Sequence, residues 1–325
     1  MSTSSTEKIL LDLRKIIPPL LDHFHKGQAG KTVVVGGSES YTGAPYYSCM
    51  SSMLFGADIG HIICEPGAGI VIKTYSPDLI VHPIMRLSRD ASENCINDIM
   101  MNISRLLERL HVVVVGPGLG MDSMMLKTAS CIISEARRRK MPIVIDADGF
   151  YCIQNKPEII AGYSNAVLTP NIAEFSRLCR AFNINENSSC EHLANKLGGV
   201  TILKKGMVDY ISNGQQTLQV NMKGCPKRCG GQGDILTGIL STLLAWRKAY
   251  LENLWEYVIL KIIYINNSSH DKTLDEHQSL ILAVFGAACT IRYCSYLAFK
   301  HKKRAMGATD IMNFIGNAYQ LLFER

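Results

Sequence analysis

The chain has 325 residues, of which 47% are apolar and 19% charged, so it can bury a large core and is most simply one α/β domain. The net charge of +6 is modest and spread out, which does not indicate nucleic-acid binding. Dense basic runs occur only at residues 137–140 and 302–304, where we expect solvated helix ends that would help to attract polyphosphate ligands.

The cysteines and the termini bear on the compartment. Eleven cysteines are scattered and largely set in apolar surroundings, as expected of a reduced interior. Cys225 and Cys229 have no second Cys/His pair at zinc-finger spacing, so a zinc site is not expected. The longest apolar run, residues 280–291, is too short to span a bilayer, and the N-terminal residues lack a signal-peptide core. We therefore expect a cytoplasmic protein, with no membrane contact; an alternative start that directs the chain to mitochondria stays open.

Short β-branched runs alternate with helix-like segments, the pattern of a doubly wound sheet. Strands are expected at residues 32–35, 112–115, 143–145, 167–168 and 201–203, and each ends in glycine or a polar turn. Apolar stripes at helical spacing predict two core helices, at residues 172–182 and 235–244. Residues 210–211 and 217–220 predict a hairpin, and residues 266–277 a polar surface loop.

Two glycine motifs look like nucleotide-binding loops and fail in detail. Gly30-Lys31-Thr32 would need a glycine where His25 stands, and it precedes a strand, so it is not a Walker A loop. The run Gly-Pro-Gly-Leu-Gly at residues 116–120 would need its third glycine at Met121, which disfavours an NAD-dependent dehydrogenase. Its glycines still indicate close backbone approach to another group.

Polar groups that follow the strands are the candidates for chemistry, because ligands of open α/β sheets bind there. Asn171 and Glu174 are spaced as a helix capping box, and Glu174 could equally hold Mg²⁺ through water. Lys205 stands at a strand end, suited to phosphate, although lone lysines there are usually solvated. Asp146 and Asp148 could serve a metal or a ribose, or form an Asx turn.

Residues 224–234 read GCPKRCGGQGD and run into an apolar helix-like stretch. Gly230, Gly231 and Gly233 allow backbone N–H groups to converge on one point, and the positive end of the following helix favours an anion there. Asp234 would sit where a transferred phosphoryl group meets its acceptor, which makes it a candidate base. A glycine-rich surface turn before a buried helix is the alternative.

Six motifs in consistent order from about residue 18 onward resemble the ATP-dependent (S)-NAD(P)H-hydrate dehydratases of the ribokinase-like superfamily. They are Gly-Gly-Ser-x-x-Tyr-Thr-Gly-Ala-Pro (36–45), Gly-Pro-Gly-Leu-Gly (116–120), Asp-Ala-Asp-Gly (146–149), Thr-Pro-Asn-x-x-Glu-Phe (169–175), Lys-Lys-Gly (204–206) and Lys-Arg-Cys-Gly-Gly-Gln-Gly-Asp (227–234). The resemblance implies a three-layer α/β/α sandwich with a mostly parallel central sheet. It spans residues 18–325 as one domain, and residues 1–17 would be an N-terminal extension.

The resemblance also implies the reaction and its site. The family uses ATP as co-substrate, with Mg²⁺, to dehydrate (6S)-hydrated NADH or NADPH, and Asp234 would be the catalytic base. Contacts to the hydrated dinucleotide are implied for Asp234 and for Gly118, Asn171, Ile172, Ala173, Glu174, Phe175, Ser176 and Arg177. Contacts to ATP are implied for Lys205, Gly206, Met207, Val208, Asp209, Gly224, Cys225, Pro226, Lys227, Arg228, Cys229, Gly230, Gly231, Gln232 and Gly233.

Further expectations follow from the same resemblance. Tyr41, Thr42 and Gly43 would close over the nicotinamide, although Thr-Gly-Ala-Pro is also a good helix entry. Some relatives carry a fused epimerase domain, for which this chain has no room before residue 18, so a separate NAD(P)H-hydrate epimerase is expected as a functional partner. Assembly into a homo-oligomer is left open. Two rivals remain: a ribokinase-like kinase of a small alcohol, and a catalytically silent nucleotide-binding protein.

Overall fold

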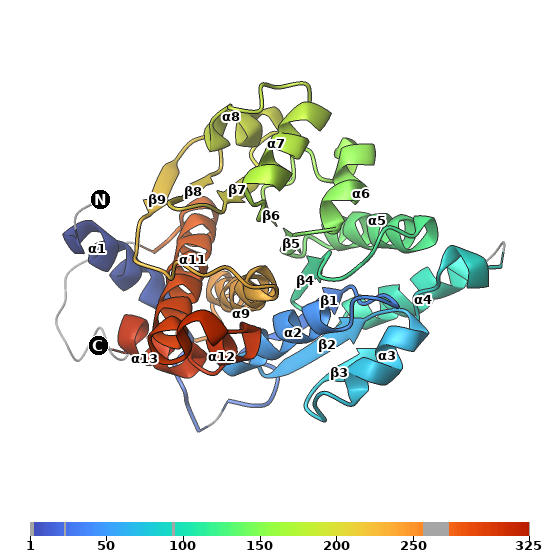
Figure 1. Ribbon diagram of the computed structural model, residues 1–325, viewed down its shortest axis with the longest axis horizontal. Helices are drawn as coiled ribbons and strands as arrows, with labels where there is room; N and C mark the ends of the chain where they lie inside the picture. Colours follow the sequence, from blue (N-terminus) through green and yellow to red (C-terminus); the bar gives the residue numbers. More distant parts are fainter. Residues whose placement is uncertain (1–2, 23, 93–94, 256–272, 325) are drawn as a thin grey trace.

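A computed structural model describes residues 3–22, 24–92, 95–255 and 273–324. Within these residues the chain forms a central sheet covered by helices on both faces (Figure 1). This is the expected three-layer α/β/α sandwich.

The sheet has the strand order β3-β2-β1-β4-β5-β6-β7-β8-β9 within the described chain. The strands are β1 (Lys31–Val35), β2 (Ile59–Ile63), β3 (Ile80–His82), β4 (Val112–Val115), β5 (Ile143–Ile145), β6 (Ala166–Leu168), β7 (Thr201–Lys204), β8 (Asp209–Ser212) and β9 (Thr217–Val220). β1 to β7 pair in parallel, and β8 and β9 are antiparallel. The five predicted strands and the hairpin are therefore confirmed, and β2 and β3 are additional.

Alternate residues of each inner strand serve two separate cores, because successive side chains of a strand point to opposite faces. Val34 and Val114 face one core and Val33 and Val115 face the other, and all four are fully buried. The first core is covered by α1 (Thr3–Leu13), α2 (Gly43–Phe55), α9 (Gln232–Leu251), α11 (Glu276–Lys302), α12 (Ala308–Met312) and α13 (Ile315–Phe323). The second is covered by α4 (Cys95–Leu107), α5 (Ser123–Arg138), α6 (Gly149–Asn155), α7 (Ile172–Ala181) and α8 (Cys190–Lys196), while α3 (Pro66–Lys73) packs beside β3.

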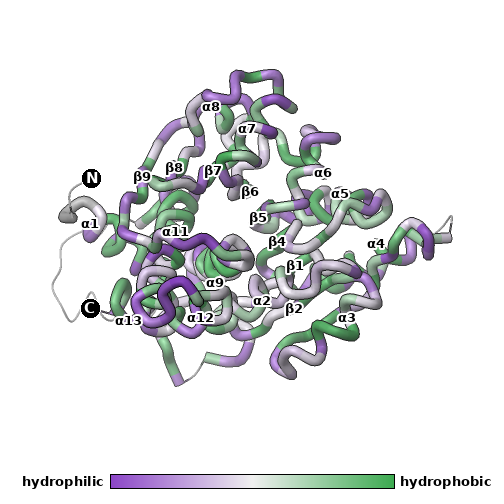
Figure 2. The backbone as a smooth tube through the Cα atoms, in the orientation of Figure 1, coloured by the Kyte–Doolittle hydropathy of each residue, from purple (hydrophilic) through white to green (hydrophobic). Residues whose placement is uncertain are grey.

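α9 is largely hydrophobic along its length, as its green colour in Figure 2 shows. Among the described residues one helical stretch, Glu276–Ala305, is long and apolar enough to cross a membrane, but 83% of its most apolar window is buried inside the fold. It packs against α9, α12 and α13. We therefore assign it to the core of the domain.

Three details differ from the sequence-based expectations. Ile172 is 60% exposed instead of buried, because it occupies the first turn of α7, beside a cleft. Residues 266–272 of the expected polar loop lie outside the described residues, and its end is helical, since Asp275 caps α11 from Glu276 onward. Leu13 and Ile16, within the expected N-terminal extension, are fully buried in the first core. The domain boundary near residue 18 stays a prediction.

All eleven cysteines are free thiols, as expected of a reduced interior. Burial raises the pKa of the Cys64 thiol to about 12 and that of Cys152 to about 11. Such thiols are poor nucleophiles at neutral pH, so these two cysteines act as packing residues.

α2 and α9 approach each other closely at Gly238. A Cβ added to Gly238 would lie 2.0 Å from the Ser48 carbonyl oxygen of α2. Ser48 and Thr237 share a hydrogen bond of 2.8 Å, and the Thr242 hydroxyl donates to the Ser52 carbonyl over 2.8 Å. The hydrogen bonds of these hydroxyl groups and the lack of a side chain at Gly238 thus set the distance between α2 and α9. They also hold the start of α9 in place.

We expect Gly238→Ala to destabilise the protein by about 2–3 kcal/mol, because the methyl group can fit only if α2 and α9 move apart. Gly316→Ala is the matched control: that glycine lies in α13, and its added Cβ would meet nothing within 4 Å. Urea unfolding of both variants measures the difference. Equal stabilities would show that the α2–α9 contact adjusts without cost.

Candidate active site

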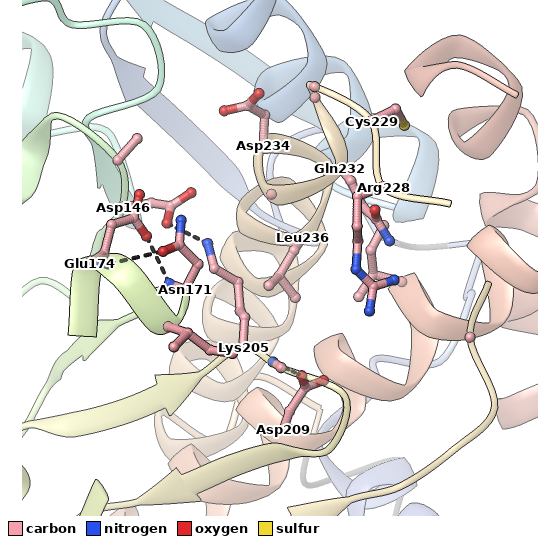
Figure 3. Close-up of a pocket in the computed structure, with 18 of the residues that line it drawn as sticks. Asp146, Asn171, Glu174, Lys205, Asp209, Arg228, Cys229, Gln232, Asp234 and Leu236 are labelled. Atoms are coloured by element: carbon pink, nitrogen blue, oxygen red, sulfur yellow. Dashed lines mark hydrogen bonds and ion pairs between the residues drawn. The ribbon is translucent and has the colours of Figure 1, made fainter. Parts of the chain in front are cut away.

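A cleft of about 790 Å³ opens beyond the carboxyl ends of β5, β6 and β7, at the N-terminus of α9 (Figure 3). Its volume is typical of a small-molecule site. It is lined by Asp146, Ala147, Asn171, Ile172, Ala173, Glu174, Lys205, Gly206, Met207, Asp209, Gly224, Arg228, Cys229, Gly230, Gly231, Gln232, Gly233, Asp234, Leu236, Ile291 and Arg292.

The glycine-rich turn forms the start of α9. Gly231 precedes the helix with a left-handed backbone (φ 88°), and a Cβ there would lie 2.6 Å from Ala308 Cβ, so glycine is required on both counts. The Ile235 N–H is the first to bond back along the helix, to the Gly231 carbonyl at 3.0 Å. The helix therefore starts at Gln232, earlier than the sequence indicated, and Asp234 lies within its first turn, where unpaired N–H groups favour an anion.

Lys205 and Asp146 form an ion pair against this turn. Lys205 Nζ lies 2.8 Å from Asp146 Oδ1, and the Asp146 side chain is only 4% exposed. A Cβ built on Gly233 would be 3.4 Å from both Asp146 Oδ2 and Lys205 Nζ, so the pair faces the backbone of the turn. Asp146 thus holds Lys205 in place at the strand end. The alternative, a lone lysine surrounded by water, does not apply.

Burial and the neighbouring Asp146 carboxylate shift the pKa of two acids around Lys205. Burial, followed by repulsion from Asp146, raises the pKa of Asp234 to about 7, although Lys205 opposes the shift. Burial and Asp146 likewise raise the pKa of Glu174. Burial by itself would lower the pKa of Lys205, but attraction to Asp146 and Glu174 outweighs it and raises that pKa. Near neutral pH, Asp234 can therefore both accept and release a proton.

Asn171 and Glu174 form the predicted capping box at the start of α7. Asn171 Oδ1 accepts from the Glu174 N–H at 2.9 Å, and Glu174 Oε2 accepts from the Asn171 N–H at 2.7 Å. No group of three or more His, Cys, Asp or Glu side chains among the described residues is placed to hold a metal ion unaided. Mg²⁺ usually takes one or two carboxylates together with phosphate oxygens and water, so Glu174 fits as a carboxylate that acts once a nucleotide is bound.

An ion pair that the sequence did not predict closes the opposite side of the cleft. Arg292 of α11 holds Asp209 through two bonds, of 2.6 Å from Nε and 2.8 Å from Nη2. Its guanidinium group also donates to the carbonyls of Gly206 and Met222, at 2.9 and 3.1 Å. Arg292 thus joins the loop after β7 to the segment that leads into the glycine-rich turn.

The structure brings the two implied groups of ligand-binding residues around one cleft. Asn171 to Glu174, implied for the dinucleotide, lie on one wall, and most of the residues implied for ATP lie on the other, with Asp234 between them. Their individual roles stay predictions. Leu236, Ile291 and Arg292 also line the cleft and were not predicted from the sequence. For Arg292 a signal exists, because an arginine at the end of an apolar run indicates a buried partner.

Four residues implied for the dinucleotide do not line the cleft. Phe175 is fully buried in the second core, and Arg177 lies over the Tyr151 ring and bonds its hydroxyl at 2.9 Å. Gly118 packs against Tyr41, whose carbonyl oxygen would lie 2.8 Å from an added Cβ. Ser176, next along α7, also lies outside the lining. The glycines of residues 116–120 therefore approach other parts of this chain, as Gly116 does at the Asp146 carbonyl.

Four residues implied for ATP also lie away from the cleft. Lys227 Nζ donates to the carbonyls of Arg304 and Met306, and the buried Cys225 thiol donates to the Lys227 carbonyl at 2.9 Å. The Lys227 side chain therefore points to the C-terminal segment, and the Cys225 side chain belongs to the first core. Pro226 and Val208 are likewise outside the lining, so Arg228 is the member of the basic pair that reaches the cleft.

Tyr41, Thr42 and Gly43 are not among the residues that line the cleft. Thr42 precedes the first residue of α2, Gly43, and its hydroxyl shares a hydrogen bond of 2.7 Å with Tyr75. Helix entry thus accounts for this segment. Tyr41 is 57% exposed, so its expected closure over a substrate stays a prediction.

Comparison with known proteins identifies relatives over nearly the whole chain. The family model described as NAD(P)H-hydrate dehydratase matches residues 32–316. The ATP-dependent (S)-NAD(P)H-hydrate dehydratase of Schizosaccharomyces pombe is 48% identical, over 99% of this chain and 96% of the relative. The protein of the same name from Phaeosphaeria nodorum is 46% identical, over 98% of this chain and 96% of the relative.

Solved structures share the fold. A ribokinase-like superfamily protein from Enterococcus faecalis has a TM-score of 0.71 at 19% identity, covering 97% of this chain and 95% of that one. The ADP/ATP-dependent NAD(P)H-hydrate dehydratase of Bacillus subtilis, co-crystallized with ATP/Mg²⁺, has a TM-score of 0.64 at 16% identity, covering 96% and 97%. The expected ribokinase-like fold is therefore confirmed.

The raised pKa of Asp234 predicts how stability depends on pH. The pKa is about 7 in the folded chain and has an ordinary value of 3.8, so the carboxyl group's stabilising contribution is complete below the ordinary value and is lost as the pH rises through 7. Asp234→Asn should therefore raise the thermal unfolding midpoint, and by more at about pH 8 than at about pH 5. Calorimetry at the two pH values measures this, and a gain that is equal at both would contradict the raised pKa.

Arg292→Met should cost about 3 kcal/mol of stability, because it leaves the Asp209 carboxylate buried without its partner. The double variant with Asp209→Asn should recover most of that loss, since the amide needs no counter-charge and still accepts from the Gly206 N–H. Arg89→Met is the control: in its pair with Glu39 both side chains are 64% exposed, so the substitution should leave the free energy of unfolding nearly unchanged. Additive losses in the double variant would contradict the coupling.

Proposed function

The chain belongs to the family of ATP-dependent (S)-NAD(P)H-hydrate dehydratases, and from that premise we propose which of its residues carry the reaction. It is an enzyme, a lyase that uses ATP to remove water from hydrated NADH or NADPH and restores the intact cofactor. The reaction repairs damaged nicotinamide nucleotides. The observation that supports the assignment of roles is Asp234 in the first turn of α9, with its pKa raised to about 7 beside the Lys205 ammonium group.

Asp234 acts as the general base. Hydroxide is a poor leaving group, so the C6 hydroxyl of the hydrated ring is first phosphorylated. Asp234 takes the proton of this hydroxyl. At the same time the hydroxyl oxygen forms a bond to the γ-phosphorus of ATP, and the bond between that phosphorus and the ADP oxygen breaks. A carboxyl with a pKa near 7 is well matched to accept this proton near neutral pH.

The turn before Asp234 stabilises the charge that develops during transfer. The first turn of α9 and the Lys205 ammonium group line the cleft side by side, since Lys205 Nζ would lie 3.4 Å from a Cβ on Gly233, so both can bind the oxygens of the transferring phosphoryl group. Lys205 would exchange part of its contact with Asp146 for these oxygens. Loss of phosphate from C6, driven by the ring nitrogen's electron pair, and loss of a proton from the neighbouring carbon then restore the dihydropyridine.

In this proposal each substrate has its own set of contacts within the one cleft. We assign ATP to the side of Lys205, Gly206, Met207 and the glycine-rich turn, and the hydrated dinucleotide to the side of Asn171 and Glu174. Mg²⁺, when bound, would neutralise phosphate charge there, with Glu174 as the carboxylate that holds it through water. The epimerase expected to supply the S form is a functional partner in this proposal.

The assay follows NADH absorbance in the near ultraviolet and ADP release when the protein is mixed with hydrated NADH, ATP and Mg²⁺. We expect one NADH for each ADP. A ribokinase-like kinase would instead give ADP and a stable phosphorylated product without NADH, and that result would overturn the assignment.

Asp234→Asn should lower the turnover number by about 100-fold or more, because proton removal from the hydroxyl is lost, while ATP is still bound. In the wild type, kcat/KM should fall as the pH drops below about 7, as Asp234 becomes protonated. Cys95→Ser, outside the cleft, is the control. Unchanged turnover in Asp234→Asn would remove Asp234 from the mechanism.

A further inference from the structure

A second cleft, of about 840 Å³, lies beside the catalytic one and shares no lining residue with it. Its walls come from α1, from residues 221–223 after β9, from α11 and from α13, which lie together in Figure 1. Residues 221–223 lead directly into Gly224 of the catalytic cleft, and Tyr293 of the second cleft follows Arg292 of the first. The two clefts are therefore neighbours across one segment of chain.

The second cleft contains a cation, Arg14, with one unsatisfied donor. The Nε atom of Arg14 is buried and has no hydrogen-bond partner among the described residues. The Nη2 atom of the same guanidinium group donates to the Leu322 carbonyl over a long distance of 3.5 Å. A buried donor without an acceptor is costly, and a guanidinium group pairs best with an oxyanion. Lys223 adds a second positive charge to the lining, and Glu7 a negative one.

The rest of the lining suits a flat apolar group. Tyr293 and Tyr296 are stacked, with centroids 6.1 Å apart and planes inclined by 24°, and Lys223 Nζ lies 5.7 Å from the centre of the Tyr296 ring. Five apolar side chains complete the cleft: Leu10, Leu11, Met222, Leu321 and Leu322. Leu11 is 56% exposed, so part of this apolar lining faces solvent. Aromatic ligands stack against such rings, while the cations orient their acidic group.

We propose that this cleft is a second binding site, for a flat aromatic compound that carries one anionic group. The ring packs against the two tyrosines and the leucines, and the anion binds Arg14 and Lys223. A net lining charge of about one positive unit matches a monoanion better than a polyphosphate. The site is separate from the ATP cleft and does not depend on the reaction proposed above.

Binding here should be felt in the catalytic cleft. Met222 lines the second cleft, and its carbonyl oxygen accepts a hydrogen bond from Arg292. Arg292 in turn holds Asp209 and the loop after Lys205. A ligand that moves Met222 would shift this network and so change the affinity for the nucleotide. The bound nucleotide would then change the affinity for the ligand by the same factor.

The test uses 2-naphthoate, a flat aromatic monoanion, titrated calorimetrically into the full chain with ADP at saturation. We expect one saturable site that remains when ADP is bound. Arg14→Met should weaken binding about tenfold or more, since a charge-assisted hydrogen bond is lost, and Tyr293→Ala should also weaken it. Lys8→Met, an exposed cation of α1 outside the cleft, should leave the affinity unchanged.

Three outcomes would overturn the proposal: competition between naphthoate and ADP, equal affinity in wild type and Arg14→Met, or no binding at all. Absence of binding together with a dimer in sedimentation would assign the cleft to a second copy of the chain. Arg14→Lys is the control for misfolding of Arg14→Met, because lysine keeps the positive charge and lacks only the guanidinium donors, including Nε. With an unchanged unfolding midpoint, it should bind naphthoate with an affinity between those of wild type and Arg14→Met.

Discussion

The Lys205 ammonium group stands among three carboxylates, and the rest of the site depends on this arrangement. Asp146 is bonded to it directly, while Glu174 and Asp234 interact with it through their charges. Without this cation, three acids in one half-buried cleft would repel each other and take up protons. With it, Asp234 keeps a pKa near 7, and the cleft retains a positive charge that can turn toward phosphate.

The fold supplies this arrangement by bringing strand ends together. β5, β6 and β7 are parallel neighbours, so Asp146, Asn171 and Lys205, which follow them, emerge at one edge of the sheet. α9 enters from the same side, and its closeness to α2, set at Gly238, determines where its first turn lies. The bonds of Arg292 then hold the loop after β7 against the segment before the glycine-rich turn. Each of these contacts links residues that are far apart in the sequence.

Much of the site was predictable because its signals are local. Glycines next to an aspartate before an apolar helix indicate an anion-binding helix start, and the Asn171–Glu174 spacing indicates a capping box. The lining of the cleft differs from the implied contacts where a neighbour in the sequence is not a neighbour in the cleft. Phe175 is next to Glu174 but points to the core, because adjacent residues of a helix face different directions. Lys227 is next to Arg228, yet the carbonyls of the C-terminal segment hold it away from the cleft.

By itself the sequence determined the class of fold, the family and the identity of the candidate base, since strand period, turn chemistry and motif order are written in consecutive residues. Only the tertiary structure decided that Asp146 pairs with Lys205, that Arg292 binds Asp209, and that the Arg14 Nε donor, at a second cleft, has no acceptor among the described residues. It also decided the raised pKa of Asp234, which depends on burial and on a carboxylate 88 positions away in the chain. Electrostatic interactions act through space, and the distances that set their strength exist only once the chain has folded.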